Sequence, residues 1–199
     1  MKIKPDLAYL VGALRDGSVF YEKSSRNYIA VWYEEDKRWL KESISKRLNK
    51  LFGKPGWLLK YKQKHHRIRF SSKLVHNMLI NEFDFISPQK YWSTPKIIKH
   101  ANKDIIKNYI AGFFDAEGDI SIKDKSLGFS QKNKESLKFI RNWLINNKIE
   151  CSKIFIADKK SETNRFYISK INNLLIFRRL IPFEHPDKLH LLELLLQRT

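Results

Sequence analysis

Residues 110–118 read IAGFFDAEG: a glycine stands among alanine and large apolar side chains, and the stretch closes on Glu117 and Gly118. Residues 7–17, LAYLVGALRDG, follow the same order and close on Asp16 and Gly17. A residue without a Cβ lets one backbone approach another closely. We therefore expect two helices that pack together and bring their two carboxylates side by side.

The same succession of elements follows each motif. Each is followed by two short strands, a helix with apolar residues at helical spacing, a second hairpin and further helical residues. The expected segments are 18–22, 28–33, 40–51, 57–62, 67–71 and 73–82 in the first half, and 119–123, 126–131, 133–144, 153–158, 165–169, 172–180 and 188–197 in the second. This order predicts a tandem duplication of an αββαββα unit. We assign residues 1–92 and 108–199 to the two halves and 93–107 to a connector.

The charge of the chain points to a polyanionic partner. It has 39 Lys and Arg against 21 Asp and Glu, a formal net charge of +18. Such an excess repels itself, and nucleic acid is the partner that best offsets it. An anionic membrane surface is a weaker alternative, since the basic residues do not gather on one amphipathic helix. A basic surface that serves only solubility is the other alternative.

Other classes are disfavoured by composition. No apolar run approaches the roughly 18 residues of a membrane helix, so we expect a soluble protein without a membrane partner. Cys151 is the single cysteine, which excludes an intrachain disulfide and a cysteine-based metal site and fits a reducing compartment. We expect an intracellular, cytoplasmic protein, with an organelle as an alternative.

Paired carboxylates indicate a metal centre. Two acids at adjoining helix ends repel each other and suffer from the negative helix ends, unless cations intervene. Hard cations such as Mg²⁺ (or Mn²⁺) suit such a pair and promote phosphodiester cleavage. A single helix that ends in Asp-Gly is more often a plain C-terminal turn. Two copies in matching context favour the metal centre.

The motifs at 7–17 and 110–118 resemble those of the LAGLIDADG homing endonucleases in their monomeric, two-motif form, and the resemblance spans nearly the whole chain. It implies two pseudo-symmetric halves, each with a curved antiparallel sheet, packed through the motif helices into a DNA-binding saddle. It also implies a monomer that makes a staggered double-strand break in DNA at a long asymmetric site. The residue match is better in the second half, where residues 129–135 read FSQKNKE.

The resemblance also implies roles for individual residues. The metal site would comprise Asp16 and Glu117 with the glycines that follow them, Gly17 and Gly118. Gln131 and Lys132 would be polar companions in the second half. Late basic residues come from Pro88-Gln89-Lys90 and Pro186-Asp187-Lys188. The implied catalytic set is Asp16, Glu117, Gln131, Lys90 and Lys188.

The first half departs from this pattern. Glu34 and Glu35 stand where the second half has Gln131 and Lys132. An extra carboxylate there would repel the phosphate unless it turns away or recruits metal. We expect two unequal cleavage centres. The alternative is that Glu34 points into solvent beside Lys37 or Arg38 and has no catalytic part.

Strand alternation selects the residues that face DNA. In residues 67–70, RIRF, the two arginines share one face, and residues 165–168, RFYI, repeat the arrangement. A basic face of an antiparallel sheet can lie along the major groove, where side chains distinguish all four base pairs. The candidates are Arg67, Arg69, Arg165 and Tyr167, joined by the lysines Lys60, Lys62, Lys123, Lys125 and Lys132.

Two other functions remain open. A protein of the same fold could bind intron RNA as a maturase and assist splicing, because basic sheets serve either polymer. It could also be a DNA-binding protein without cleavage, although the intact pair Asp16 and Glu117 argues against loss of activity.

Overall fold

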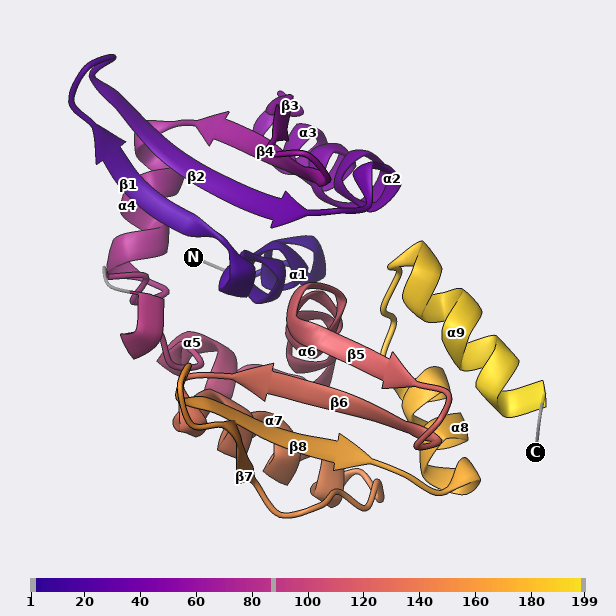
Figure 1. The fold of residues 1–199 in the computed structure, drawn as a ribbon. Coiled ribbons are helices and arrows are strands. Elements are labelled where there is room, and N and C mark those ends of the chain that lie inside the picture. Colours follow the sequence, from indigo (N-terminus) through magenta and orange to yellow (C-terminus); the bar gives the residue numbers. More distant parts are fainter. Residues whose placement is uncertain (1–2, 87–88, 198–199) are drawn as a thin grey trace.

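The structure, a computed structural model, describes residues 3–86 and 89–197. Two helices, α1 (Pro5–Ala13) and α6 (Lys103–Glu117), lie side by side at the centre, with one sheet on each side of them (Figure 1). The predicted α+β fold of two antiparallel sheets packed through motif helices is confirmed.

In the first half a short 3-10 turn at Leu14–Asp16 follows α1 and leads into the sheet, whose strand order is β1-β2-β4-β3. Asp36 starts the helical stretch after β2 by accepting the backbone N–H of Arg38, and Gly53 ends it in the left-handed region at φ 74°. The elements are β1 (Ser18–Glu22), β2 (Asn27–Glu34), α2 (Lys37–Trp39), a π-helical segment (Leu40–Ser45), α3 (Lys46–Phe52), β3 (Trp57–Tyr61), β4 (His65–Ser71) and α4 (Lys73–Asn81).

The second half repeats this order, with strand order β5-β6-β8-β7, and adds a final helix. Its elements are β5 (Gly118–Ser121), β6 (Ser126–Gln131), α7 (Lys134–Asn146), β7 (Phe155–Asp158), β8 (Thr163–Ile168), α8 (Ile171–Leu180) and α9 (Pro186–Gln197). A short helix, α5 (Lys96–Lys99), precedes α6. Residues 103–107, expected in the connector, belong to α6 because Asn102 caps this helix by accepting the Ile105 amide.

A continuous apolar core joins the two halves. All residues of α1 from Leu7 to Ala13 are buried, as are Tyr109 to Asp115 in α6. A helix that is buried on all sides lies between other elements rather than on the surface. The motif helices are therefore the interface of the two halves, and what their C-terminal ends carry is placed at the junction of the two sheets.

No helix among the described residues is both long enough and apolar enough to span a lipid bilayer.

Candidate active site

The close approach of α1 and α6 depends on one glycine in each helix. A Cβ on Gly12 would overlap the carbonyl oxygen of Tyr109, and a Cβ on Gly112 would overlap that of Tyr9. The two contacts are reciprocal, as expected for helices that cross on a pseudo-twofold axis. The predicted packing of the motif helices is therefore present, and it places Asp16 and Glu117 at adjoining ends.

The two motif acids line a common cleft. Asp16, Glu117, Gln131, Lys132 and Lys90 all border it. Asp16 also borders a second cleft, with Tyr33, Tyr61, Lys62 and His65 of the first half. Asp16 thus borders both clefts, and Glu117 borders the first of them.

The electrostatics of this pair favour a cation. Burial and the Asp16 charge raise the pKa of Glu117 to about 8. Burial and the Glu34 charge raise the pKa of Asp16 to about 6, although this side chain is open to solvent on one side. Carboxylates that hold protons this tightly are short of positive charge, and a divalent metal would supply it. The donor set therefore fits a hard cation. Gly17 and Gly118 follow the acids directly and adjoin Leu14 and Phe114 so tightly that neither has space for a Cβ.

Glu117→Gln is expected to stabilise the metal-free protein at about pH 8.5 and to leave it unchanged at about pH 4. The folded-state pKa lies above the unfolded value, so ionising Glu117 removes stability as the pH rises between them, by roughly 1–2 kcal/mol after solvent screening. Thermal unfolding in a chelator at both pH values measures the difference. A variant that is less stable than the wild type at the higher pH would contradict the prediction that the ionised Glu117 carboxylate destabilises the folded protein.

Gln131 orients Glu117. Its Oε1 accepts the backbone N–H of Lys132 at 2.8 Å, and its Nε2 donates to Glu117 Oε1, also at 2.8 Å. An amide can do both because it carries an acceptor and a donor. The structure thus brings Gln131 to the site where the resemblance implied it, while Lys132 is exposed at the cleft edge.

Glu34 occupies the matching place in the first half. Gly118 pairs with Phe129 across β5 and β6, and the β1–β2 register, continued by one residue, sets Gly17 opposite Trp32. Glu34 and Gln131 therefore both lie two residues beyond the partner of the motif glycine. Oε1 of Glu34 also accepts the next backbone N–H, that of Glu35, at 2.6 Å.

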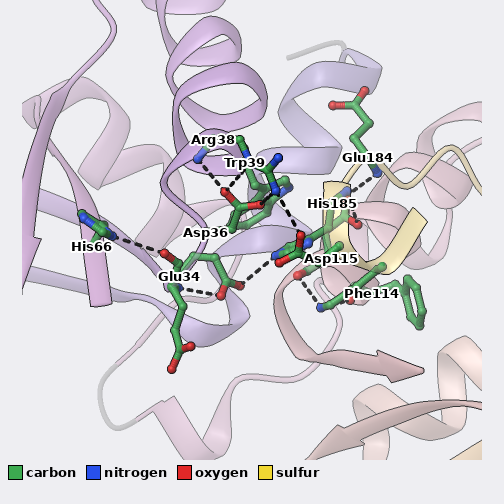
Figure 2. Close-up of polar contacts among 12 residues, drawn as sticks. Glu34, Asp36, Arg38, Trp39, His66, Phe114, Asp115, Glu184 and His185 are labelled. Carbon is green, nitrogen blue, oxygen red and sulfur yellow. Dashed lines mark hydrogen bonds and ion pairs between the residues drawn. The ribbon is translucent and has the colours of Figure 1, made fainter. Parts of the chain in front are cut away.

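Glu34 does not point into solvent, so the expectation of a solvent-facing side chain is wrong; whether Glu34 takes part in catalysis stays a prediction. Its side chain is 18% exposed, and Oε2 lies 3.6 Å from Nε2 of His185 (Figure 2). Burial would raise the pKa of Glu34, but His185 and the Glu35 amide outweigh it and hold the pKa below its usual range. The first-half centre therefore contains an ionised carboxylate where the second has an amide.

Lys188 and Lys90 lie at different places. Lys188 Nζ donates to the carbonyl oxygens of Phe114 at 2.9 Å and Asp115 at 2.6 Å, where a cation also offsets the negative end of α6. Burial lowers the pKa of Lys188, and the nearby acids Asp115, Glu34 and Glu117 oppose this shift. Lys90 is exposed at the cleft beside Glu117. Pro88, which precedes it in the motif, lies outside the described residues.

Two residues hold the chain segments that carry these lysines: Arg15, in the 3-10 turn after α1, and Asp115 of α6. The Arg15 guanidinium donates to the carbonyl oxygens of Trp92 and Ser93. Asp115, which is fully buried, accepts the backbone N–H groups of Glu184 at 2.8 Å and His185 at 3.0 Å, and the Tyr9 hydroxyl. Asp115 thus has a structural role at the interface of the two motif helices.

The arginines of the sheet faces are placed as the alternation predicts. Ile68, Phe70, Phe166 and Ile168 are buried, and the residues that alternate with them lie on the opposite face: Arg67, Arg69, Arg165 and Tyr167. Two are ion-paired, which the sequence does not show: Arg69 with Glu22, and Arg165 with Asp119 through two bonds of 2.6 and 2.7 Å. Gly128 makes room for the second pair, since a Cβ there would overlap the Arg165 guanidinium.

The remaining DNA-facing candidates lie around these arginines. Arg67 lies over the Tyr61 ring at 5.0 Å, and Tyr167 is 40% exposed. Lys123 and Lys125 lie in the β5–β6 turn, because β5 ends at Ser121 rather than Lys123. Lys60 is exposed on β3, and Lys62 follows it in the turn to β4.

A further set of ligand-type side chains lies behind Glu34. Ligand atoms of Asp36, His185 and Asp187 are within 4.8 Å of one another. The Arg38 guanidinium already bridges the two acids, at 3.2 Å from Asp36 and 3.0 Å from Asp187. We interpret this set as an ion-pair network between the halves and not as a metal centre.

Sequence reasoning missed His185, Tyr9 and Trp39 as parts of the site. Trp39 donates to the Tyr9 hydroxyl at 2.8 Å, and Tyr9 donates to Asp115, which fixes the segment that carries His185. No sequence spacing marks these residues, because their contacts join segments that are remote in the chain.

The comparisons with known proteins agree with this geometry. A family model described as a LAGLIDADG-like domain matches residues 104–182, in the second half. Homing endonuclease I-ApeI of Aeropyrum pernix is 34% identical over 198 residues, which are 96% of this chain and 87% of that protein.

Solved structures share the fold. I-DmoI in complex with DNA and Mn superposes with a TM-score of 0.70 at 20% identity, over 90% of this chain and 98% of that chain. The homing endonuclease I-WcaI bound to its DNA recognition sequence superposes with a TM-score of 0.66 at 20% identity, over 96% of this chain and 86% of that chain.

Proposed function

The chain belongs to the LAGLIDADG family of homing endonucleases, and from that premise we propose that it is a site-specific, divalent-metal-dependent DNA endonuclease. Its target would be a long asymmetric site in double-stranded DNA, cut in both strands with a stagger by one chain. The observation that carries this proposal is the pair Asp16 and Glu117, which meet at the packed ends of the two motif helices between two basic sheets.

The residues of this centre would have different roles. Asp16 and Glu117 would hold the metal, which when bound would polarise water and stabilise the leaving oxygen. Gln131 keeps the Glu117 carboxylate in place through its amide N–H. In hydrolysis the water oxygen forms a bond to phosphorus, the bridging P–O bond breaks, and the leaving oxygen gains a proton. Lys90, exposed at the cleft beside Glu117, can offset the charge that develops on the phosphate.

The direct test uses a plasmid library of randomised long inserts, incubated with the protein and Mg²⁺. Linear product that is enriched in one insert sequence, and that disappears in a chelator, supports the proposal. Binding to one insert with no cut in either strand would point instead to a DNA-binding protein without cleavage. Incubation with intron-containing RNA under the same conditions tests the splicing alternative.

Affinity for DNA is expected to fall steeply with salt. The net charge is +18, and each neutralised phosphate contributes a slope near −0.9 in log K against log salt. We expect a slope of about −5 or steeper. Fluorescence anisotropy with a labelled duplex over a range of KCl concentrations measures it. A flat response would leave the basic sheets without a part in binding and favour the solubility explanation of the charge.

A further inference from the structure

The two cleavage centres differ in the group that stands beside each motif acid. In the second half, Gln131 donates from Nε2 to Glu117. In the first half the corresponding atom is Oε2 of Glu34, which as a carboxylate oxygen has no proton to donate to Asp16. Two ionised carboxylates, Glu34 and Asp16, cannot form the hydrogen bond that Gln131 forms with Glu117. The first centre therefore cannot be ordered as the second one is.

A histidine from the opposite half faces Glu34. His185 comes from the segment between α8 and α9, and its Nε2 faces Glu34 Oε2 at 3.6 Å (Figure 2). The imidazole is 6% exposed and stacks on the Trp39 ring, with ring centroids 5.7 Å apart and planes inclined by 29°. Its backbone N–H donates to Asp115 at 3.0 Å. Both the ring and the backbone of His185 are therefore held in place.

These contacts leave lone-pair sites open on both carboxylate oxygens of Glu34. Its Oε1 accepts the Glu35 amide and its Oε2 faces the imidazole. An ionised carboxylate offers about four lone-pair sites, so one remains free on each oxygen. By the strand register, Glu34 has the same place relative to Asp16 as Gln131 has relative to Glu117. A water molecule beside Asp16 can thus donate a hydrogen bond to the Glu34 carboxylate.

We propose that His185 is a positioning residue of the first-half cleavage centre, which fixes the Glu34 carboxylate so that it accepts a proton from the attacking water. The water oxygen then bonds to phosphorus, the bridging P–O bond breaks, the leaving oxygen takes a proton from solvent, and Glu34 later returns its proton to solvent. This inference rests on the proposed endonuclease function. The proposal makes the cleavage of the two strands chemically different. One strand is cut at the centre that contains Glu34 and His185, and the other at the centre that contains Gln131.

The test is single-turnover cleavage with Mg²⁺ of the duplex selected from the plasmid library, labelled on one strand at a time. Glu34→Gln is expected to slow one strand by about 10-fold or more, because a general base is lost, and to leave the other strand within about 2-fold. His185→Leu is expected to slow the same strand selectively. The double variant is expected to be no slower than Glu34→Gln alone, because the two residues act as a unit.

Two further variants separate positioning from packing. His185→Gln keeps a side-chain N–H that can donate to Glu34, so it is expected to restore much of the lost rate, and it keeps the test valid if His185→Leu does not fold. His190→Leu removes an exposed histidine from α9, the helix that follows His185, and is expected to change the cleavage rate of neither strand. Thermal unfolding of each variant verifies that it is folded.

The outcomes are separable from those of the proposed function. A wild-type chain that cuts neither strand of any insert overturns the endonuclease proposal itself. Cleavage of both strands at rates that His185→Leu leaves unchanged, or slows equally, overturns only the inference about His185. Additive effects of Glu34→Gln and His185→Leu would do the same, because they would show that the two side chains act independently.

Discussion

Glu117→Gln is expected to reduce DNA cleavage by about 10³-fold or more while affinity for the target persists or increases. A metal-stabilised transition state gains several kcal/mol, and each 1.36 kcal/mol corresponds to a factor of ten in rate. The amide has the shape of the carboxylate and fits beside Gln131, which makes a 2.8 Å contact to Oε1. Removing a negative charge next to the DNA phosphates does not weaken association, since it lowers the repulsion.

This expectation is measured by single-turnover cleavage with Mg²⁺ and by a gel shift without metal on the same duplex. The matched control is Glu135→Gln, the same change at an exposed acid that pairs with Lys138 on α7. The control is expected to cleave like the wild type. A folded Glu117→Gln protein that no longer binds the duplex would show that Glu117 is a structural residue and not a metal ligand.

Gly112→Ala is expected to lower the stability of the protein by about 3 kcal/mol. The new Cβ would overlap the Tyr9 carbonyl oxygen and lie 2.9 Å from the Ala13 nitrogen, and both are backbone atoms of a buried helix. Neither can move without separating α1 from α6. Because these helices carry Asp16 and Glu117, the variant is expected to lose cleavage together with stability.

Gly53→Ala is the control for this second expectation. Gly53 also carries a backbone constraint, with φ at 74°, but a Cβ there would meet nothing within 4 Å. Gly53→Ala is therefore expected to lower stability by about 1 kcal/mol, through the left-handed backbone conformation alone. Urea unfolding of both variants compares the two costs. Equal losses for Gly112→Ala and Gly53→Ala would show that helix contact at Gly112 contributes nothing beyond backbone strain.

Much of the fold could be predicted because its signals are local. Apolar spacing predicted the helix that α7 forms, and Asn133 marked its start, since the cap needs only a side chain three residues before the amide it accepts from. The glycine among apolar residues in each motif, Gly12 and Gly112, predicted two helices in contact, and their reciprocal contacts confirm it.

The ends of the helices and strands were less well predicted from the sequence. The end of β5 at Ser121 and the start of α6 at Lys103 depend on which backbone groups find partners. Segment composition alone does not fix those partners, and the basic residues at 93–107 look the same in a connector and in a first helical turn.

The polar partners of the site were decided by the tertiary structure alone. The repeat makes Glu34 equivalent to Gln131, but the sequence was compatible with both a solvent-facing and an active-site position of Glu34. The choice is made by His185, which reaches Glu34 because Asp115 of α6 holds the segment before α9 through the Glu184 and His185 amides.

The sequence by itself determined the duplicated α+β architecture and the pair Asp16 and Glu117, because periodicity and repetition are properties of neighbouring residues. The tertiary structure alone decided that Arg165 is held by Asp119, that Lys188 donates to the end of α6, and that His185 faces Glu34. These contacts join segments remote in the chain. Their geometry is set by the packing of two halves around two glycines, which no local pattern encodes.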